Sequence, residues 1–218
     1  MAYADGIEFE IIRKRMKCIR LRVRKDCSVV LSMPYGYSDR EAEEFVFKNA
    51  EWIRKQQEKM ASKIVRYEDG ETIRILGEPM TLRISLGGEC SCRFRSGIVE
   101  MTVDSDDKDT KERTLRRMHF EIVAKYLDVY VPKWEAVTGK KCTSYDVKYF
   151  KSRWGVCNVK NGNIRFNTEL ATKPPGCIDY VVLHEITHLE VPNHGAEFKR
   201  LMSERMPDWK VWERKLRS

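Results

Sequence analysis

The chain has 218 residues, of which 42% are apolar, 10% aromatic and 34% charged. This composition is sufficient for a buried core and is not that of a disordered or fibrous protein. No apolar run approaches the ~18 residues of a membrane helix, and the first ten residues lack the apolar stretch of a secretory signal. Lys and Arg number 41 against 33 Asp and Glu, and the resulting net charge of +8 permits an acidic partner such as nucleic acid without requiring one.

The seven cysteines follow no zinc or disulfide pattern. Cys90 and Cys92 are separated by one residue, not by the two that are usual in zinc knuckles. Without a secretory signal, free thiols in a reducing cytosol are the simplest interpretation, so we expect a cytoplasmic protein without a membrane segment.

The first third predicts a β-rich unit followed by a helix. Apolar and polar residues alternate at 7–11 and 19–24, the period of a strand with one buried face, and residues 29–33 return as a partner strand. Ser38 opens a capping box, and apolar residues at helical spacing predict one helix over residues 39–62.

The middle of the chain returns to strands, and the part after it is helical. Four short strands bounded by glycine-containing turns are predicted at 72–76, 80–85, 90–95 and 98–103. The acidic stretch that follows is the predicted boundary between a β-rich part, residues 1–105, and a second part, residues 106–218. A long helix is predicted over 110–137, which Pro132 should kink or break and Gly139 should cap.

The second part continues with a hairpin and three helices. Residues 147–156 and 163–167 predict two strands around the Asn161-Gly162 turn. Helices are predicted over 174–190, over 193–205 with Asn193 as its cap, and from Pro207 to the end of the chain. The expected fold class is therefore α+β.

The sharpest chemical signal is an H-E-x-x-H pattern from His184 to His188, inside a predicted helix. At 3.6 residues per turn these two histidines lie about 40° apart around the helix and ~6 Å apart along it, so both imidazoles can bind one metal ion. Glu185 projects to the neighbouring edge of the helix, where it can hydrogen-bond a metal-bound water. It cannot easily be a third ligand.

A third ligand follows within a few residues. A tetrahedral catalytic zinc needs three protein ligands and one open position. Pro192 breaks the helix and lets the chain bring His194 back, which completes an H-E-x-x-H-x5-H pattern. This is the ligand spacing of the metzincins, but Val191 stands where they have glycine.

A chance pattern and a purely structural zinc are the alternatives to a catalytic metal. A chance H-E-x-x-H in a chain of this length is on the order of one in a hundred, and three of the four histidines fall between positions 184 and 194. The structural zinc is the main competitor, and Glu185 beside the first histidine argues against it. The predicted helix is largely apolar, and buried unpaired imidazoles are costly, which favours a bound metal.

The sequence resembles the YgjP-like metallopeptidase family of the zincin clan. The resemblance rests on residues 151–157, 163–167 and 179–189, followed by Asn193, His194 and Phe198. It extends weakly upstream, to the strand with alternating arginines and to residues 50–53. The histidine spacing is also similar to that of the SprT- and WSS-type proteases, which act on DNA-bound proteins.

The resemblance implies one Zn²⁺ per chain, bound by His184, His188 and His194, with Glu185 as the catalytic acid/base and a peptide or protein as substrate. Zinc would make hydroxide available at neutral pH, and Glu185 would pass its proton to the leaving nitrogen. An oxyanion donor is also expected. Tyr149, Arg153 and Tyr180 are candidates, each with a structural role as the more ordinary alternative.

Five residues before the metal helix are candidate substrate contacts: Trp154, Gly155, Asn163, Arg165 and Asn167. In zincins the strand that here spans 163–167 is often a sheet edge that pairs with an extended substrate, and such an edge hydrogen-bonds any peptide. Alternatively, Trp154 is a core anchor, Gly155 a bulge and Asn167 a strand end or a support for the metal site.

Arg20, Arg22 and Arg24 form a basic ladder on one face of a predicted strand. Such a ladder could bind phosphates, but is more often a solvated strand face. The predicted function is therefore a zinc-dependent peptidase. The alternatives are a DNA-associated protease, a nucleic-acid-binding module with a structural zinc, and a zinc amidase acting on a non-peptide amide.

Overall fold

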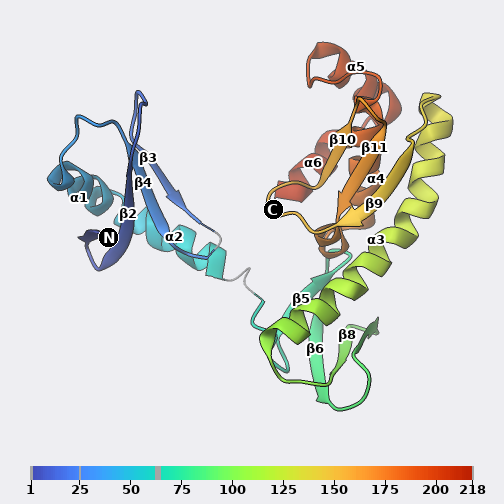
Figure 1. The fold of residues 1–218 in the computed structure, drawn as a ribbon, viewed down its shortest axis with the longest axis horizontal. Coiled ribbons are helices and arrows are strands. Elements are labelled where there is room, and N and C mark those ends of the chain that lie inside the picture. The colour runs from blue at the N-terminus through green and yellow to red at the C-terminus, as the bar shows by residue number, and fades with distance from the viewer. Residues whose placement is uncertain (1, 25, 62–64, 218) are drawn as a thin grey trace. The chain divides into compact units, whose positions relative to one another are not determined.

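A computed structural model describes residues 2–24, 26–61 and 65–217, in two compact units that comprise residues 1–65 and 66–218 (Figure 1). Runs of strands are followed by runs of helices along the chain, as in the α+β class, which confirms the predicted fold class. In the described residues, no helix is both long and apolar enough to cross a membrane.

The first unit is a four-stranded sheet with two helices on one face. Its strands lie in the order β1-β2-β4-β3, with the central pair parallel and both outer pairs antiparallel. The strands are β1 (Ala2–Ala4), β2 (Ile7–Arg13), β3 (Arg20–Val23) and β4 (Val29–Met33). The helices α1 (Asp39–Lys48) and α2 (Ala50–Ala61) contribute Val46 and Ile53 to a core with Phe9 and Leu31.

The predicted helix over 39–62 is two helices, because the chain turns at Asn49. The predicted capping box at Ser38 is present, since its side chain and that of Glu41 each accept from the other's backbone. The Asn49 side chain donates to the Phe45 carbonyl at 2.7 Å, and its own amide bonds back to Val46. These local hydrogen bonds of Asn49 thus interrupt the helical hydrogen-bond pattern between α1 and α2. Ser62 lies outside the described residues.

The second unit opens with the four predicted strands of the middle region. They are β5 (Thr72–Ile75), β6 (Glu78–Leu86), β7 (Ser91–Arg95) and β8 (Ile98–Val103). Their order, β5-β6-β8-β7, and their directions repeat those of the first sheet. This topological repeat has no counterpart in the sequence patterns, because parallel pairing joins strands that are not adjacent in the chain.

The long helix α3 (Lys108–Thr138) continues past Pro132, which was expected to kink or break it. Val131 and Trp134 on either side of the proline are buried, and the Trp134 indole donates to Asp179 at 2.6 Å. Packing against the next long helix thus offsets the missing hydrogen bond at Pro132. The predicted cap at Gly139 is present, with a φ of 68°.

The chain divides into its two compact units after Val65, whereas the boundary expected from the sequence lies near residue 105. Residues 66–105 belong to the second unit because α3 packs against β7 and β8. The Leu76 amide also donates to the Ala171 carbonyl at 2.7 Å, and Gly77 lies directly against Pro174. The polar, acidic stretch is therefore a loop inside this unit.

The predicted hairpin belongs to a three-stranded sheet with a different strand order. The expected strand over 147–156 is two strands, β9 (Ser144–Lys148) and β10 (Gly155–Asn158), which lie on opposite sides of β11 (Asn163–Asn167). β10 pairs with β11 antiparallel and β9 pairs with it parallel. β11 is therefore central and not the expected edge strand, and β10 is an edge of this sheet.

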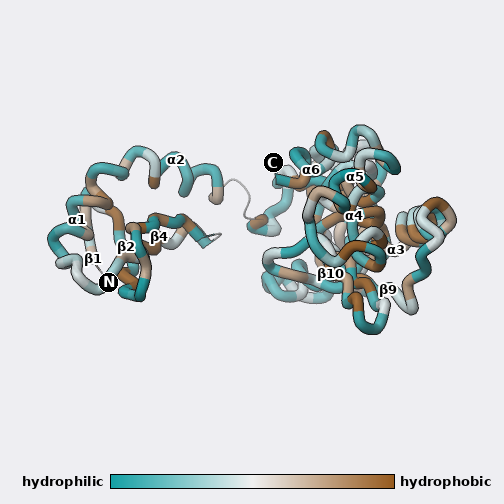
Figure 2. Tube along the Cα trace, turned by 90° about the horizontal axis from the view of Figure 1, so that it is seen from above, coloured by the Kyte–Doolittle hydropathy of each residue, from teal (hydrophilic) through white to brown (hydrophobic). Residues whose placement is uncertain are grey.

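The helix with the H-E-x-x-H pattern is central in the second unit. α4 (Pro175–His188) follows the short 3-10 helix η1 (Thr168–Thr172), and α3, β10, α5 (Ala196–Arg205) and α6 (Trp209–Arg217) pack around it. Figure 2 shows apolar residues, coloured brown, along α4. Helix α5 begins after Gly195 and not at the predicted cap Asn193, which leaves His194 on the turn before the helix.

Gly176 is expected to be needed for the docking of α6 on α4. A Cβ at this position would lie 2.5 Å from the Trp212 ring. Glycine to alanine normally stabilises a helix, but here the clash should dominate and lower the free energy of unfolding by about 1–3 kcal/mol. Urea denaturation of Gly176→Ala measures this. The loss should shrink when Trp212 is also changed to Leu, and a more stable Gly176→Ala protein would contradict this account of the packing.

Candidate metal centre and active site

Three imidazoles converge at the C-terminal end of α4. His184 and His188 lie one turn apart on the helix, which ends at His188, and the following turn brings back His194. Nε2 of His184 lies 3.2 Å from Nε2 of His188 and 3.0 Å from Nε2 of His194. Among the described residues, these three form the one group of His, Cys, Asp or Glu side chains close enough to share a metal ion.

Neighbouring groups hold these rings in place. Nδ1 of His188 lies 3.1 Å from the Val191 carbonyl, which fixes the proton on Nδ1 and leaves the Nε2 lone pair free. The Tyr180 hydroxyl lies 3.4 Å from Nδ1 of His184. Phe198 on α5 is 2% exposed and touches all three rings, at centroid distances of 4.8–5.0 Å.

The cluster fits a tetrahedral metal ion. Burial, and secondarily the other two histidines, lower the pKa of His184 to about 3, and burial also lowers the pKa of His188. Both rings are therefore neutral at pH 7, the form that binds a metal. With metal–nitrogen bonds of ~2.0–2.1 Å, a tetrahedron places its nitrogens ~3.3–3.4 Å apart, close to the two separations found here.

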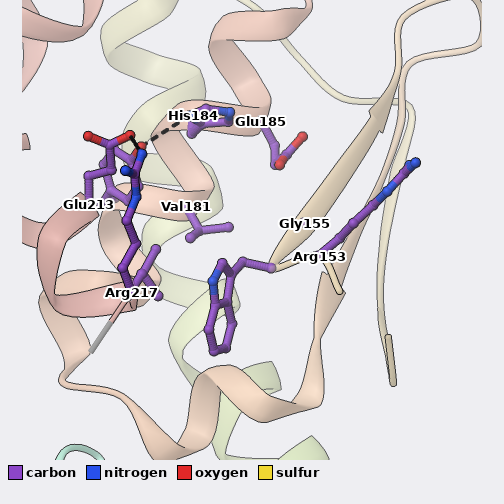
Figure 3. A pocket seen from close by; sticks show the side chains of 10 residues that line it. Arg153, Gly155, Val181, His184, Glu185, Glu213 and Arg217 are labelled. Carbon is purple, nitrogen blue, oxygen red and sulfur yellow. Dashed lines mark hydrogen bonds and ion pairs between the residues drawn. The ribbon is translucent and has the colours of Figure 1, made fainter. Parts of the chain in front are cut away.

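Glu185 is 5% exposed and points toward the start of β10 (Figure 3). Burial raises the pKa of Glu185 to about 8, whereas a hydrogen bond from the Cys157 backbone and the charge of Arg153 act to lower it. Gly155 is in contact with this carboxyl group, since a Cβ there would lie 2.6 Å from Oε1. The strand and the helix can approach this closely only because residue 155 has no side chain.

A cleft of about 310 Å³ opens beside His184 and Glu185. The residues before and at the start of β10 form one wall, α6 forms the other, and α4 lies between them (Figure 3). On the α6 wall, Arg217 donates to Glu213 at 2.7 Å. The lining residues are Arg153, Trp154, Gly155, Tyr180, Val181, His184, Glu185, Glu213, Leu216 and Arg217. The cleft thus joins a candidate metal site and a buried carboxyl group to space for a substrate.

Residues 17–218 match the family model described as YgjP-like, metallopeptidase domain. The chain belongs to the YgjP-like metallopeptidase family. The match spans all of the second unit, with the histidines and the cleft, and most of the first, which confirms the resemblance seen in the sequence. A search of curated proteins found no match.

In this YgjP-like metallopeptidase, the candidate substrate residues separate into two groups. Trp154 and Gly155 line the cleft, and Trp154 is half-buried there. Asn163 and Arg165 do not line it. Asn163 accepts a hydrogen bond from Ser144 at the far end of β11, and Arg165 is exposed on the sheet face opposite the buried residues Ile164 and Phe166.

Asn167 supports the loop before β10. It is buried, and its side-chain NH₂ donates to the carbonyls of Phe150 and Arg153 at 2.9 and 2.5 Å. Its Oδ1 accepts from the amides of Phe150 and Glu169. Because these bonds use the whole amide group, the geometry favours support of the cleft wall over direct contact with a substrate.

The three oxyanion candidates lie in different surroundings. Tyr149 packs under the Arg116 guanidinium, 3.9 Å from its ring centroid, and does not line the cleft. Tyr180 is buried, with its hydroxyl toward His184, while Arg153 is exposed on the cleft wall. The contact of Phe198 with the three histidine rings was not predicted, because a single residue name carries no sign of such a contact. A supporting role was one of the alternatives considered for Asn167.

Proposed function

We propose that this metallopeptidase is zinc-dependent and hydrolyses peptide bonds, with His184, His188 and His194 as zinc ligands and Glu185 as its acid/base. The observation that supports this most is the convergence of three imidazoles beside a buried carboxyl group and an open cleft. Three histidines and one open position are the ligand set of catalytic zinc. No fourth His, Cys, Asp or Glu of the described residues joins the group, which disfavours a closed structural site.

The residues divide the chemistry between them. Bound zinc would supply a water of lowered pKa and a Lewis acid for the substrate carbonyl. The charge of bound zinc would lower the pKa of Glu185 and favour its carboxylate. Held between α4 and β10, that carboxylate would accept a proton from the attacking water and deliver it to the leaving nitrogen. Its fixed position beside His184 would orient that water before the reaction.

The free edge of β10 is the proposed place for the substrate backbone. Among the described strands, β10 pairs with β11 alone, and Trp154 and Gly155, at its beginning, line the cleft. An extended peptide can add to such an edge through main-chain hydrogen bonds whatever its sequence. This role was expected of β11, which is paired on both sides.

The test is hydrolysis of an unfolded protein by the zinc-loaded full-length chain. We expect about one zinc per chain and new α-amino groups that disappear when a chelator is added and return with zinc. His188→Ala should lose most of the zinc and the activity. Full zinc content in His188→Ala would contradict the ligand assignment. Release of amine from a non-peptide amide, without cleavage of any peptide, would favour the zinc amidase instead.

A further inference from the structure

A cluster of cations without a carboxylate partner among the described residues lies in the first unit, whereas the proposed zinc ligands all belong to the second. Between positions 13 and 25, eight of thirteen residues are Lys or Arg and none is Asp or Glu. Arg13 pairs with Asp39, and Arg24 pairs with Glu10 at 2.8 Å. Five others are exposed and form no ion pair with a carboxylate of the described residues: Lys14, Arg15, Lys17, Arg20 and Arg22.

The sheet topology gathers these cations at one end. β2 and β4 are parallel with Arg13 opposite Met33, and antiparallel β3 places Arg20 opposite Ser32. The loop from β2 to β3 therefore lies beside the beginning of β3 and the end of β4 (Figure 1), and the Lys14 amide donates to the Met33 carbonyl at 3.1 Å. The topology thus brings these five cations together near one end of the sheet.

The two arginines of β3 share one face of the sheet. Leu21 and Val23 pack on the core beneath the helices, so Arg20 and Arg22 project from the opposite face. Residues two apart in a strand are about 7 Å apart, similar to the separation of successive phosphates along a nucleic-acid strand. Arg24, the third member of the predicted ladder, is held by Glu10 and is not part of this set.

Two exposed aromatic rings lie at the same end of the sheet as the cations. Tyr35 and Tyr37, in the loop that follows β4, are 70% and 38% exposed. They lie at the sheet end that also carries the loop from β2 to β3, since both loops leave the ends of parallel strands. Unpaired cations that neutralise phosphates, beside exposed rings on which bases stack, are the combination that binds single-stranded nucleic acid.

We propose that this surface, formed by Lys14, Arg15, Lys17, Arg20, Arg22, Tyr35 and Tyr37, binds single-stranded nucleic acid without base specificity. The cations contact phosphates and the tyrosines stack on bases. No base-reading motif accompanies them, so the affinity should depend on salt and not on sequence.

The test measures fluorescence anisotropy of a labelled oligothymidylate of about 20 nucleotides with the full-length chain, between about 50 and about 200 mM salt. Arg20→Ser with Arg22→Ser should reduce the salt slope by up to about 1.4, since each phosphate contact with a single strand contributes about 0.7. The matched control, Lys140→Ser with Lys141→Ser, removes two exposed charges from the second unit and should leave the slope unchanged. Equal losses in both double variants would overturn the proposal, because binding would then follow net charge alone.

The tyrosines provide an independent readout. Tyr35→Ala and Tyr37→Ala should each weaken binding about tenfold with the salt slope unchanged, whereas Tyr35→Phe should bind as the wild type does, since stacking does not need the hydroxyl. All these positions are exposed, and circular dichroism would verify that the variants fold. Binding of duplex as tight as that of the single strand, insensitive to the tyrosines, would overturn the proposal. So would binding of anionic vesicles but of no oligonucleotide. Neither result bears on zinc or on peptide hydrolysis.

Discussion

Glu185→Gln is expected to lower kcat/KM for peptide hydrolysis by about 10²–10⁴-fold while the chain keeps its zinc. Glutamine has nearly the shape of glutamate, so the contact with Gly155 and the bond from the Cys157 backbone remain possible. The amide cannot accept a proton from water, which removes the proposed acid/base step. Metal content by elemental analysis and initial rates on an unfolded protein measure the two parts of this prediction.

A matched control separates catalysis from a general loss of charge. Glu204, on α5, is exposed and pairs with Arg200, away from the cleft. Glu204→Gln removes the same charge and should leave both zinc content and turnover close to wild type. Near wild-type turnover in Glu185→Gln would exclude Glu185 from the proposed mechanism, and loss of zinc would mean that the carboxyl group also holds the metal site together.

Local patterns predicted the parts of the site that depend on one stretch of chain. Helical spacing places His184 and His188 on the same side of α4, and the helix end at His188 lets His194 return within six residues. The capping box at Ser38 and the cap at Gly139 are equally local. Each of these predictions needed only the geometry of a single helix and its ends.

What the sequence could not predict depends on contacts between distant residues. Apolar alternation indicates strands over residues 144–167, but the order β10-β11-β9 requires the chain to cross β11 in the loop that Asn167 holds. The assignment of the sheet edge to β11 was therefore wrong. In the same way, burial of Val131 and Trp134 lets α3 continue through Pro132, where a local rule predicts a kink or a break.

At Gly155, a contact between distant residues changes the role that the sequence alone suggests. From the sequence alone, this glycine is a candidate substrate contact or a bulge. In the structure it leaves space for the proposed catalytic carboxyl group, since an added Cβ would lie 2.6, 2.8 and 2.9 Å from Oε1, Cγ and Cδ of Glu185. These distances are too short for real Cβ contacts, so the carboxyl group or the strand has to move if the position gains a side chain.

Gly155→Ala is therefore expected to lower kcat/KM for peptide hydrolysis about 10²-fold, the size of loss that a displacement of ~1 Å causes at a reacting group. Zinc should be retained, because the three atoms nearest to the added Cβ all belong to Glu185 and none to a histidine. Initial rates and metal content measure this. Gly36→Ala is the control, since nothing lies within 4 Å of a Cβ there. Turnover unchanged by Gly155→Ala would show that the position of Glu185 is not limiting.

The same clash makes a prediction about stability that does not depend on the reaction. Overpacking at Gly155 should lower the free energy of unfolding by about 1–3 kcal/mol. Glu185→Asp withdraws the carboxyl group from the added Cβ, so the loss caused by Gly155→Ala should be smaller in that background by at least about 0.5 kcal/mol. Urea denaturation of the two single variants and the double variant completes the cycle. If the two losses of unfolding free energy were strictly additive, the added Cβ would displace the strand β10 and not the Glu185 side chain. A loss of activity in Gly155→Ala would then have to arise from the displaced cleft wall.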